Sequence, residues 1–288
     1  MLYNAALVLE GGAMRGQYTA GVLDTFLKND IELSSVIGVS AGALCGANFV
    51  SKQYGRASGV NIKYRHDRDY ISLTHLFKRE NIINFDFIFT DHGYRWHQFD
   101  ERAYRRSASD FTIVATSLAD GKTVTFDKPV GRDLVKALKA SCSIPFICDP
   151  QATTQGPCLD GGVADSVPYD LAFDQGYNKV VVIRTRNREY RKKPSGKLME
   201  QITNHSFEDH PQFAKALIKR PIMYNQQIEQ IDSLVDEGRM FCIAPKKPVK
   251  IGRLEHSTKK IRGLYETGLR EGAAAVPALT RFLMDTAY

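Results

Sequence analysis

The stretch "VIGVSAGALCGANF", residues 36–49, joins a run of β-branched residues to a run of small residues with a helical pattern. The change occurs at Gly38-Val39-Ser40-Ala41-Gly42, where one serine stands between two glycines. In a nucleophile elbow, the turn from strand to helix is so tight that glycines must flank the serine, whose hydroxyl then projects into open space. A Gly-x-Ser-x-Gly string also arises by chance in roughly one chain in ten of this size. The rest of the sequence must therefore decide between a nucleophile elbow and a chance match.

The residues before this stretch have the pattern of another strand and helix. A continuous apolar run over residues 5–9 predicts a strand buried on both faces. A glycine-rich loop over 10–16 follows, and apolar residues then recur at helical spacing as far as residue 27. Residues 35–39 predict a second strand and 41–52 a second helix. This alternation predicts a parallel sheet covered by helices.

The remainder of the chain is more varied. Residues 53–107 are rich in Tyr, Phe, Arg and His with weak periodicity, which indicates irregular helices and loops that form a candidate cap. Asp120-Gly121 between two β-rich runs predicts a hairpin. The other predicted elements are a helix over 133–140, a loop with short extended pieces over 141–168, a strand over 179–185, a basic loop over 186–197, helices over 207–237 broken at Pro221, a strand over 240–244, and a helix from 257 interrupted at Pro277. We expect a catalytic domain over 1–200 and a mainly helical extension over 201–288 packed on it.

The composition excludes several classes of protein. The chain has 288 residues, 43% hydrophobic and 25% charged, which is ordinary for a globular protein. No apolar stretch reaches the length of a membrane span, and the N-terminus lacks the basic and apolar regions of a signal peptide, so we expect a cytoplasmic protein. The five cysteines form no CxxC pair and the seven histidines have no ligand spacing, which argues against a disulfide framework or a metal site.

Three motifs occur in order along the chain: Gly11-Gly12-Ala13-Met14-Arg15-Gly16, the serine elbow 38–42, and Leu159-Asp160-Gly161-Gly162. With these motifs the sequence resembles the patatin-like phospholipases, which carry a Gly-Gly-x-x-Arg-Gly loop, a Gly-x-Ser-x-Gly elbow and a late Asp-Gly-Gly or Asp-Gly-Ala. Residues 140–146 also resemble the family's segment ahead of its aspartate. The resemblance covers roughly residues 5–185, and residues 251–272 resemble the tail of a bacterial subgroup more weakly.

The resemblance implies a three-layer α/β/α sandwich with a mainly parallel sheet and a helical C-terminal extension. It implies a serine acyl hydrolase of the lipase or phospholipase A type that needs no metal or cofactor and cleaves a phospholipid or other acyl ester. Ser40 would be the nucleophile and Asp160 the general base, while Gly11, Gly12 and Ala13 would form the oxyanion hole. The residues that it implies as supporting are Arg15, Gly16, Gly38, Gly42, Gly161 and Gly162.

Each of these residues also has a purely structural interpretation. Serine is favoured as a helix N-cap, so Ser40 at the start of a helix need not be a nucleophile. Asp160 can act as a base only if it is partly desolvated, and Asp-Gly is also a common turn. Arg15 either has a functional role, in which it stabilises charge in the loop or attracts an anionic head group, or is a surface arginine in the first turn of a helix. Ala13 stands where the family more often has a third glycine.

Two other functions stay open at this point. A histidine-dependent esterase acting on soluble esters would use the same elbow, although so little sheet precedes it here. A non-catalytic nucleotide- or nucleic-acid-binding protein would use the glycine loop and the net charge of +7, but Ala13 replaces the second glycine of a dinucleotide motif. We therefore expect no nucleic-acid partner. The basic residues 184–193 form either a solvated face or a peripheral contact with the anionic inner face of a membrane.

Overall fold

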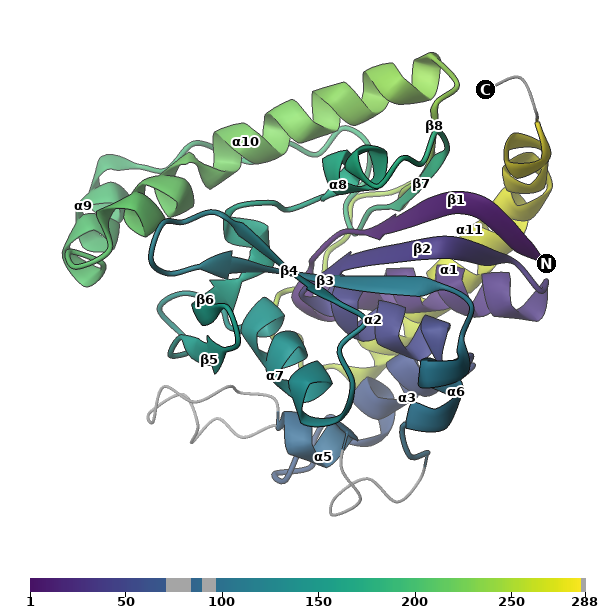
Figure 1. The fold of residues 1–288 in the computed structure, drawn as a ribbon, viewed down its shortest axis with the longest axis horizontal. Helices are drawn as coiled ribbons and strands as arrows, with labels where there is room; N and C mark the ends of the chain where they lie inside the picture. The colour runs from purple at the N-terminus through teal and green to yellow at the C-terminus, as the bar shows by residue number, and fades with distance from the viewer. Residues whose placement is uncertain (71–83, 90–96, 286–288) are drawn as a thin grey trace.

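The computed structural model describes residues 1–70, 84–89 and 97–285. Its centre is an eight-stranded mixed sheet with the order β5-β6-β3-β2-β1-β7-β8, in which β4 pairs with the edge of β3 that is opposite β2 and β6 (Figure 1). The strands are β1 (Leu2–Leu9), β2 (Glu32–Val39), β3 (Asp110–Ser117), β4 (Thr123–Asp127), β5 (Gln151–Thr153), β6 (Gly156–Asp160), β7 (Val180–Ile183) and β8 (Met240–Ile243). The five strands from β3 to β8 along this order are parallel, and the predicted hairpin is the antiparallel pair of β3 and β4.

Helices cover both faces of this sheet. One face carries α1 (Gly16–Lys28), α2 (Ala41–Val50), α7 (Gly131–Cys142) and α11 (Thr258–Met284). The other face carries α8 (Tyr169–Asp174) and α10 (Pro211–Asp236), with α9 (Lys197–Ser206) beside the start of α10. The three-layer α/β/α architecture predicted from the sequence is thus confirmed. None of the helices in the described residues is long and apolar enough to cross a membrane.

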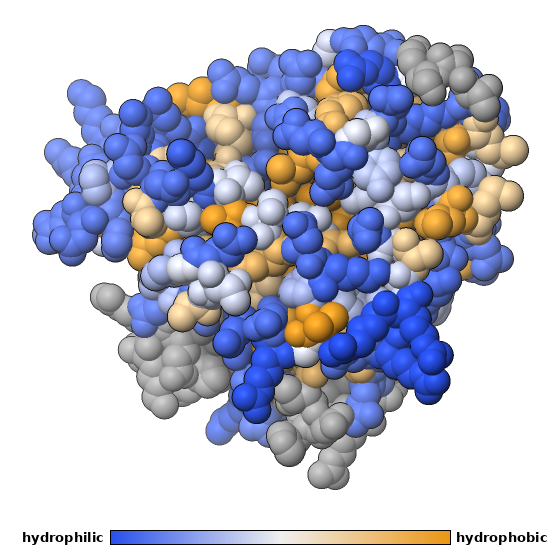
Figure 2. All heavy atoms as spheres, in the orientation of Figure 1, coloured by the Kyte–Doolittle hydropathy of each residue, from blue (hydrophilic) through white to orange (hydrophobic). Residues whose placement is uncertain are grey.

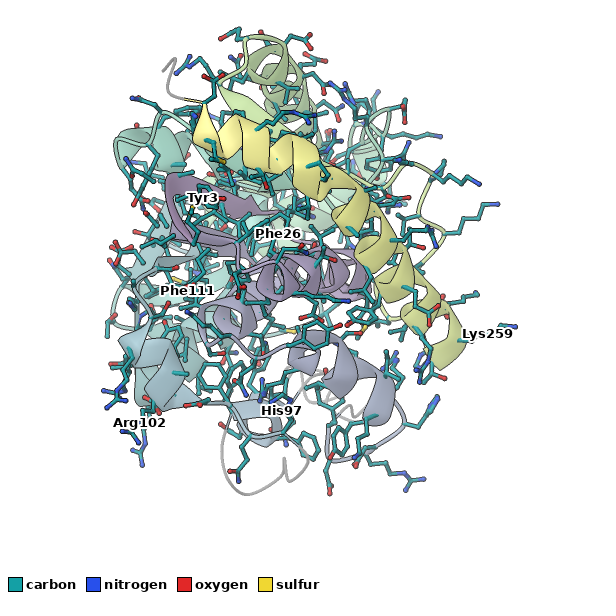
Figure 3. All side chains as sticks on the ribbon, turned by 90° about the vertical axis from the view of Figure 1, so that its right-hand side faces the viewer. Tyr3, Phe26, His97, Arg102, Phe111 and Lys259 are labelled. Carbon is teal, nitrogen blue, oxygen red and sulfur yellow. The ribbon has the colours of Figure 1, made fainter. Side chains whose placement is uncertain are left out.

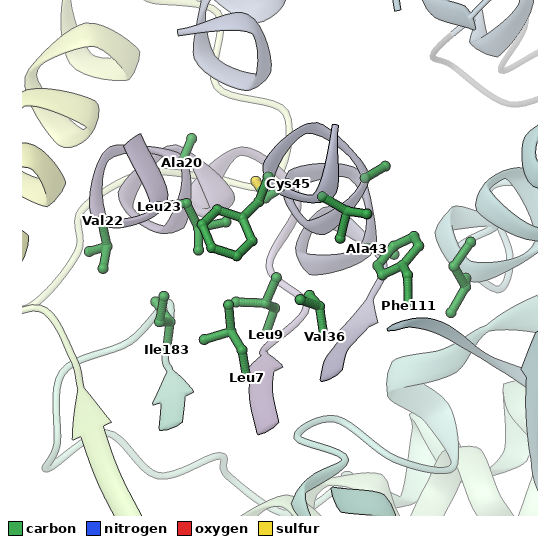
Figure 4. Close-up of a cluster of buried hydrophobic side chains, with 14 of the residues drawn as sticks. Leu7, Leu9, Ala20, Val22, Leu23, Val36, Ala43, Cys45, Phe111 and Ile183 are labelled. Carbon is green, nitrogen blue, oxygen red and sulfur yellow. The ribbon is translucent and has the colours of Figure 1, made fainter. Parts of the chain in front are cut away.

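The central strands are buried on both faces, as their continuous apolar runs predict. Leu7 and Leu9 of β1 pack under α1 and α2, whereas the alternating Ala6 and Val8 pack toward α8 and α10. Figure 4 shows Leu7, Leu9, Val36 and Ile183 rising from the strands toward the helices that carry Ala20, Leu23, Ala43 and Cys45. This double burial fixes the register of the strands, and with it the positions of the loops at their carboxyl ends.

Two predicted helix breaks are wrong. Pro221 lies inside the continuous helix α10, and Pro277 lies inside the continuous helix α11. A proline removes one backbone hydrogen bond and costs about 3 kcal/mol in a helix interior. Both helices continue because apolar side chains are buried on either side of the proline and offset that cost. In α10, the buried side chains are Phe213 and Ala214 before Pro221, and Tyr224, Ile228 and Ile231 after it. In α11, they are Ile261 and Leu264 before Pro277, and Leu279 and Leu283 after it.

The C-terminal helix α11 lies across α1 at very close range (Figure 3). A Cβ atom at Gly21 would collide with the carbonyl oxygen of Tyr265, and one at Gly268 with the carbonyl oxygen of Tyr18. Across the same contact, the Tyr265 hydroxyl donates a hydrogen bond of 2.7 Å to Asp24. Residues 201–288 therefore supply a strand and two helices of the sandwich, and the predicted division at residue 200 stays a prediction.

The predicted cap, residues 53–107, is described in part. Its described helices are α3 (Arg56–Lys63), α5 (Phe85–Phe89) and α6 (Glu101–Arg106), and residues 71–83 and 90–96 lie outside the described residues. The fully buried Arg56 ties this segment to α2, since its guanidinium donates to Asn48 Oδ1 at 2.8 Å and to the carbonyl oxygens of Ile88 and His97. The assignment of the segment as a cap stays a prediction.

Candidate active site

Ser40 occupies a strained turn between β2 and α2. Its backbone has φ 53° and ψ −123°, a conformation that non-glycine residues rarely adopt. Ser40 is also the N-cap residue of α2, but its side chain makes no capping hydrogen bond. The hydroxyl is therefore not used to cap the helix, which removes the simplest structural explanation for the serine.

The glycines that flank Ser40 are required by close packing. A Cβ atom at Gly38 would lie 2.7 Å from the backbone of Ala43. A Cβ atom at Gly42 would collide with the carbonyl oxygen of Leu9, at the end of the neighbouring strand. The tight turn thus lets α2 start directly against β1 and β2, which places Ser40 beside the glycine loop that follows β1.

We expect Gly42→Ala to destabilise the protein by about 1–3 kcal/mol, because the added methyl group has no space beside Leu9. Thermal unfolding followed by circular dichroism measures the effect as a lower Tm. Gly263→Ala in α11 is the matched control, since Gly263 is exposed and a Cβ atom there meets open space. The control should have an equal or higher Tm, because alanine favours a helix by about 1 kcal/mol over glycine. Equal Tm values for the wild type and Gly42→Ala would contradict the packing argument.

The strand registers bring Ser40 and Asp160 together. Val39, the last residue of β2, lies opposite Val114 of β3, and Asp160, the last residue of β6, lies opposite Ala115. Since β4 occupies the other edge of β3 at both positions, β2 and β6 share one edge of β3. Ser40 and Asp160 therefore meet where the end of one strand faces the end of the other.

Hydrogen bonds from residues at the end of α7 hold the ends of β2 and β6 in place. The Ser141 hydroxyl accepts a hydrogen bond of 2.8 Å from the backbone N–H of Ser40 and donates one of 2.6 Å to the carbonyl oxygen of Val114. The backbone N–H of Asp160 donates to the carbonyl oxygen of Ser143 at 2.7 Å. Cys142 lies between Ser141 and Ser143 in the sequence, and burial raises the pKa of its thiol well above the usual value. The charge of Asp160 also raises this pKa, whereas a hydrogen bond with Ser40 lowers it. Cys142 is thus a neutral neighbour of the pair.

The Asp160 carboxylate is held in a fixed orientation. It is 8% exposed, and its Oδ1 accepts a hydrogen bond of 2.9 Å from the backbone N–H of Gly162. No donor from the described part of the chain reaches Oδ2. Gly161 packs against the carbonyl oxygen of Val114, where a Cβ atom would collide. The Asp-Gly-Gly segment therefore forms a turn, as its structural interpretation predicts, and that turn leaves one carboxylate oxygen unused.

The glycine loop after β1 presents backbone donors beside Ser40. The N–H groups of Gly11, Gly12 and Ala13 donate to no other described residue. Ala13 has φ 49°, in the left-handed region that favours glycine, so the loop reaches this geometry in spite of the Cβ atom. Gly12 packs on Thr185, whose Oγ1 would lie 2.7 Å from an added Cβ atom, and Gly16 packs on Ala41 at the start of α2.

Arg15 is a partly buried residue and not a surface arginine. It lines the cavity that also contains Ser40 and Asp160, and its Nε is buried without a hydrogen-bond partner. Burial, followed by the charge of Arg186, lowers the pKa of Arg15 to about 10. Of the two interpretations that the sequence leaves open, the position of Arg15 agrees with an anion contact.

Two cavities meet at Ser40. The first, of about 100 Å³, is lined mainly by apolar side chains from α2, the loop after α7 and the described part of residues 53–107, among them Leu44, Val60, Phe85, Ile88 and Ile147. The second, of about 430 Å³, contains the glycine loop, Asp160 and basic side chains. Ser40 and Ala13 line both cavities, so an ester at Ser40 has an apolar space on one side and a polar space on the other.

Among the described residues, neither a histidine nor a metal-binding cluster contributes to this arrangement. Of the five histidines that the structure describes, none lines either cavity, and His75 and His92 lie outside the described residues. In the same described ranges, no cluster of three or more His, Cys, Asp or Glu side chains is arranged to hold a metal ion.

The family model of the patatin-like phospholipases matches residues 7–173, which span β1 to α8 and include the loop, the elbow and Asp160. The chain belongs to the patatin-like phospholipase family. The family predicted from the three motifs is thus confirmed. A second family model, a domain of unknown function (DUF6363), matches residues 210–284, which run from the start of α10 through β8 to the end of α11 in this patatin-like protein.

Relatives of this patatin-like protein have different lengths. It is 27% identical to the uncharacterized protein YjjU of Escherichia coli over 98% of this chain and 80% of that protein. It is 26% identical to the probable lipid hydrolase 463L of Invertebrate iridescent virus 6 over 59% of this chain and 64% of that protein. The solved structure of VipD from Legionella pneumophila aligns with a TM-score of 0.51 and 10% identity, covering 96% of this chain and 67% of VipD. That last likeness concerns the fold alone.

Several residues of the site are not predicted by the sequence motifs. Ser141 and Ser143 lie in the segment 140–146 that carries the resemblance, but neither was given a role. Arg220 of α10 was also missed, although its Nε donates a hydrogen bond of 2.5 Å to the carbonyl oxygen of Gly162. No local pattern marks Arg220, because only the packing of α10 on the sheet brings it to Asp160.

Proposed function

We propose that this patatin-like protein cleaves lipid esters with Ser40 and Asp160 as a catalytic dyad. Membership of the family supports lipid hydrolase activity. The main observation in support of the dyad is that β2 and β6 pair with the same edge of β3. Val39, which precedes Ser40, lies opposite Val114, and Asp160 lies opposite the next residue, Ala115. The Ser40 hydroxyl, which makes no capping hydrogen bond, and the unused Oδ2 of Asp160 agree with this pairing.

In the proposed reaction, Ser40 Oγ attacks the carbonyl carbon of the ester while Asp160 takes the hydroxyl proton. The tetrahedral intermediate then collapses, and Asp160 returns the proton to the departing alcohol, which leaves an acyl group on Ser40. A water molecule attacks this acyl-enzyme and gives a proton to Asp160. Collapse releases the fatty acid and restores the Ser40 hydroxyl. The hydrogen bond from Gly162 keeps Asp160 oriented throughout.

The free N–H groups of Gly11, Gly12 and Ala13 are the proposed oxyanion donors. They have no protein acceptor among the described residues and lie in the loop that packs against the end of β2. Ser40 also stands at the N-terminus of α2, whose dipole favours negative charge. Donors that are already free and fixed stabilise a developing charge without reorganisation.

The competing functions find less support at this site. A histidine triad needs an imidazole within hydrogen-bond reach of the serine, and the described histidines do not line the cavities. A nucleotide-binding loop would leave the strained serine and the adjacent aspartate without a role. An acyl hydrolase uses both.

Hydrolysis of a short-chain ester in the presence and absence of EDTA tests the proposal. We expect turnover that changes by less than about twofold on chelation, because the proposed nucleophile and base are protein groups. The release of a free fatty acid, measured by mass spectrometry, identifies acyl transfer to water. A folded wild-type protein without turnover on any acyl ester, or one inactivated by EDTA and restored by a metal, would contradict the proposal.

We further propose that the protein contacts membranes through α9, and we keep the predicted cytoplasmic location as a prediction. The basic loop contributes less exposed charge than the sequence suggests, since Arg184 is fully buried and Arg188 and Arg191 both contact Asp232. On α9, however, Leu198, Met199 and Ile202 are exposed beside Lys197. Figure 2 shows apolar residues among hydrophilic ones on the side of the molecule where α9 lies.

Vesicle binding should rise with the fraction of anionic lipid and fall with salt, because an exposed apolar helix with basic neighbours favours such surfaces. Replacing Leu198 and Ile202 by serine should reduce binding in a sedimentation assay. Leu2→Ser, an exposed leucine at the start of β1, is the control and should leave binding unchanged. Equal binding of the wild type to neutral and anionic vesicles, or equal binding of the α9 variant, would remove this part of the proposal.

A further inference from the structure

The polar cavity beside Ser40 is lined by an excess of basic side chains. Its volume is about 430 Å³, and its wall contains Arg15, Arg186, Lys192, Lys193, Arg220 and Arg253. These residues come from the glycine loop, the loop after β7, α10 and the segment before α11. The carboxylates in the same wall are Glu10 and Asp160. Such a concentration of one charge in a concave site costs free energy unless an anion occupies it.

Ion pairs within the described residues do not neutralise this charge. Within the described ranges, none of the six basic side chains forms an ion pair with a carboxylate. Glu10 is instead engaged by the backbone N–H of Thr185 and by the Tyr224 hydroxyl at 3.0 Å. Arg15 adds a buried Nε without a partner. The cavity therefore has unused donors as well as unused positive charge.

Lys192 and Arg220 make the inner part of this wall. The Lys192 ammonium lies 3.7 Å from the centre of the Tyr224 ring and 3.4 Å from Ser166 Oγ. Burial, followed by the charge of Arg220, lowers the pKa of Lys192 to about 6. An anion placed between these side chains would favour the charged form of the lysine, because its negative charge would stabilise the ammonium group.

We propose that this cavity is a head-group site that binds the phosphate of an anionic phospholipid while the scissile ester lies at Ser40. This inference rests on the proposed function, since it assigns the head group of the substrate whose acyl chain enters the apolar cavity. The two cavities share Ser40 and Ala13, so one molecule can occupy both. Arg15, Lys192 and Arg220 supply the donors for the phosphate oxygens.

The charge of the cavity also determines which head groups fit. A phosphate monoester brings up to two negative charges and several acceptor oxygens, which match the unpaired guanidinium groups. A choline head group brings a quaternary ammonium, which the surrounding arginines repel. The site should therefore select phosphatidate over phosphatidylcholine with the same acyl chains.

Binding to Ser40→Ala tests this inference without turnover. Dihexanoyl phosphatidate and dihexanoyl phosphatidylcholine, both below their micelle concentrations so that no lipid surface is present, are titrated into the variant in a calorimeter. We expect phosphatidate to bind at least about 10-fold more tightly, which is the effect of one charge-assisted hydrogen bond. Equal affinities for the two lipids, or a preference for phosphatidylcholine, would overturn the inference.

A second substitution in the same background locates the site. Lys192→Gln keeps the length and polarity of the side chain but removes its charge, and should weaken phosphatidate binding about 10- to 100-fold. Lys219→Gln is the matched control, because Lys219 precedes Arg220 on α10 but is exposed and outside the cavity. Equal losses in the two variants, or no loss in Lys192→Gln, would place the phosphate elsewhere and overturn the assignment.

Inorganic phosphate separates a lipid site from a site for a free anion. We expect it to bind far more weakly than dihexanoyl phosphatidate, since the acyl chains contribute through the apolar cavity. If inorganic phosphate binds as tightly, the lipid assignment is wrong. Turnover by the wild type is measured separately, so a protein that selects phosphatidate but hydrolyses no ester would refute the proposed function and leave the head-group site standing.

Discussion

Asp160→Asn is expected to lower kcat on a lipid ester by about 10⁴-fold, because the amide cannot take the proton of Ser40. The substitution keeps the shape of the side chain, and Oδ1 can still accept the hydrogen bond from Gly162. Ser40→Ala should reduce hydrolysis to the background rate. Steady-state kinetics with a fluorogenic ester measures both effects in protein that has a wild-type circular dichroism spectrum.

Asp165→Asn is the matched control for this prediction. Asp165 follows in the same loop, does not line the cavity, and accepts a hydrogen bond of 2.6 Å from Gln227. Burial raises its pKa to about 6, so its carboxyl group is already partly neutral near pH 6 and the amide is a mild change. The control should keep wild-type kcat. Substantial turnover by Asp160→Asn would return Asp160 to the role of a turn residue.

Substitution of the histidines tests whether a triad, and not a dyad, performs the hydrolysis. A triad histidine carries the proton itself, so its loss is as severe as the loss of the serine. In the proposed dyad, no single His→Ala substitution among the seven should abolish hydrolysis in folded protein. One folded but inactive histidine variant would favour the triad and contradict the dyad.

Gly12→Ala is the second substitution with a large expected effect, a loss of about 10²–10³ in kcat. The added Cβ atom would lie 2.7 Å from Oγ1 and 2.9 Å from Cβ of Thr185, so the loop must move away from β7. That movement displaces the N–H groups of Gly12 and Ala13 from the carbonyl oxygen of the ester. The same kinetic assay measures the loss.

Two further variants separate misplaced donors from general damage. Thr185→Gly in the Gly12→Ala background removes the colliding atoms and should restore part of the activity, whereas the backbone N–H of residue 185 can still donate to Glu10. Ala13→Gly changes the neighbouring residue without a collision and relieves its positive φ, so it should keep activity. Full activity in Gly12→Ala would place the oxyanion hole elsewhere.

Local patterns were enough to predict the central part of this fold. The apolar runs of β1, β2 and β7 are buried on both faces, and such runs have few alternatives in an α/β protein. The strained turn at Ser40 was also predictable, since Gly38 and Gly42 mark the close approach of α2 to the strands. Strand β6 was predicted only as an extended piece in a loop, because its three ladder pairs with β3 are short and non-local.

The parts that the sequence did not predict depend on contacts between distant segments. Whether Pro221 and Pro277 break their helices depends on the apolar surface buried on either side, which local propensity does not contain. Similarly, the sequence predicts Lys192 on a solvated face or at a membrane contact, yet it lies against Tyr224 of α10. Arg220 reaches Gly162 from a helix about 60 residues further along the chain.

Labelling with a fluorophosphonate, followed by mass-spectrometric mapping of the modified peptide, tests the nucleophile directly. The reagent phosphonylates an activated serine, with loss of fluoride, and does not require a particular lipid substrate. The account predicts one label, on Ser40, in the wild type, and no label on Ser40 in Asp160→Asn over the same time. A label on a different residue, or no label on folded wild-type protein that hydrolyses esters, would contradict it.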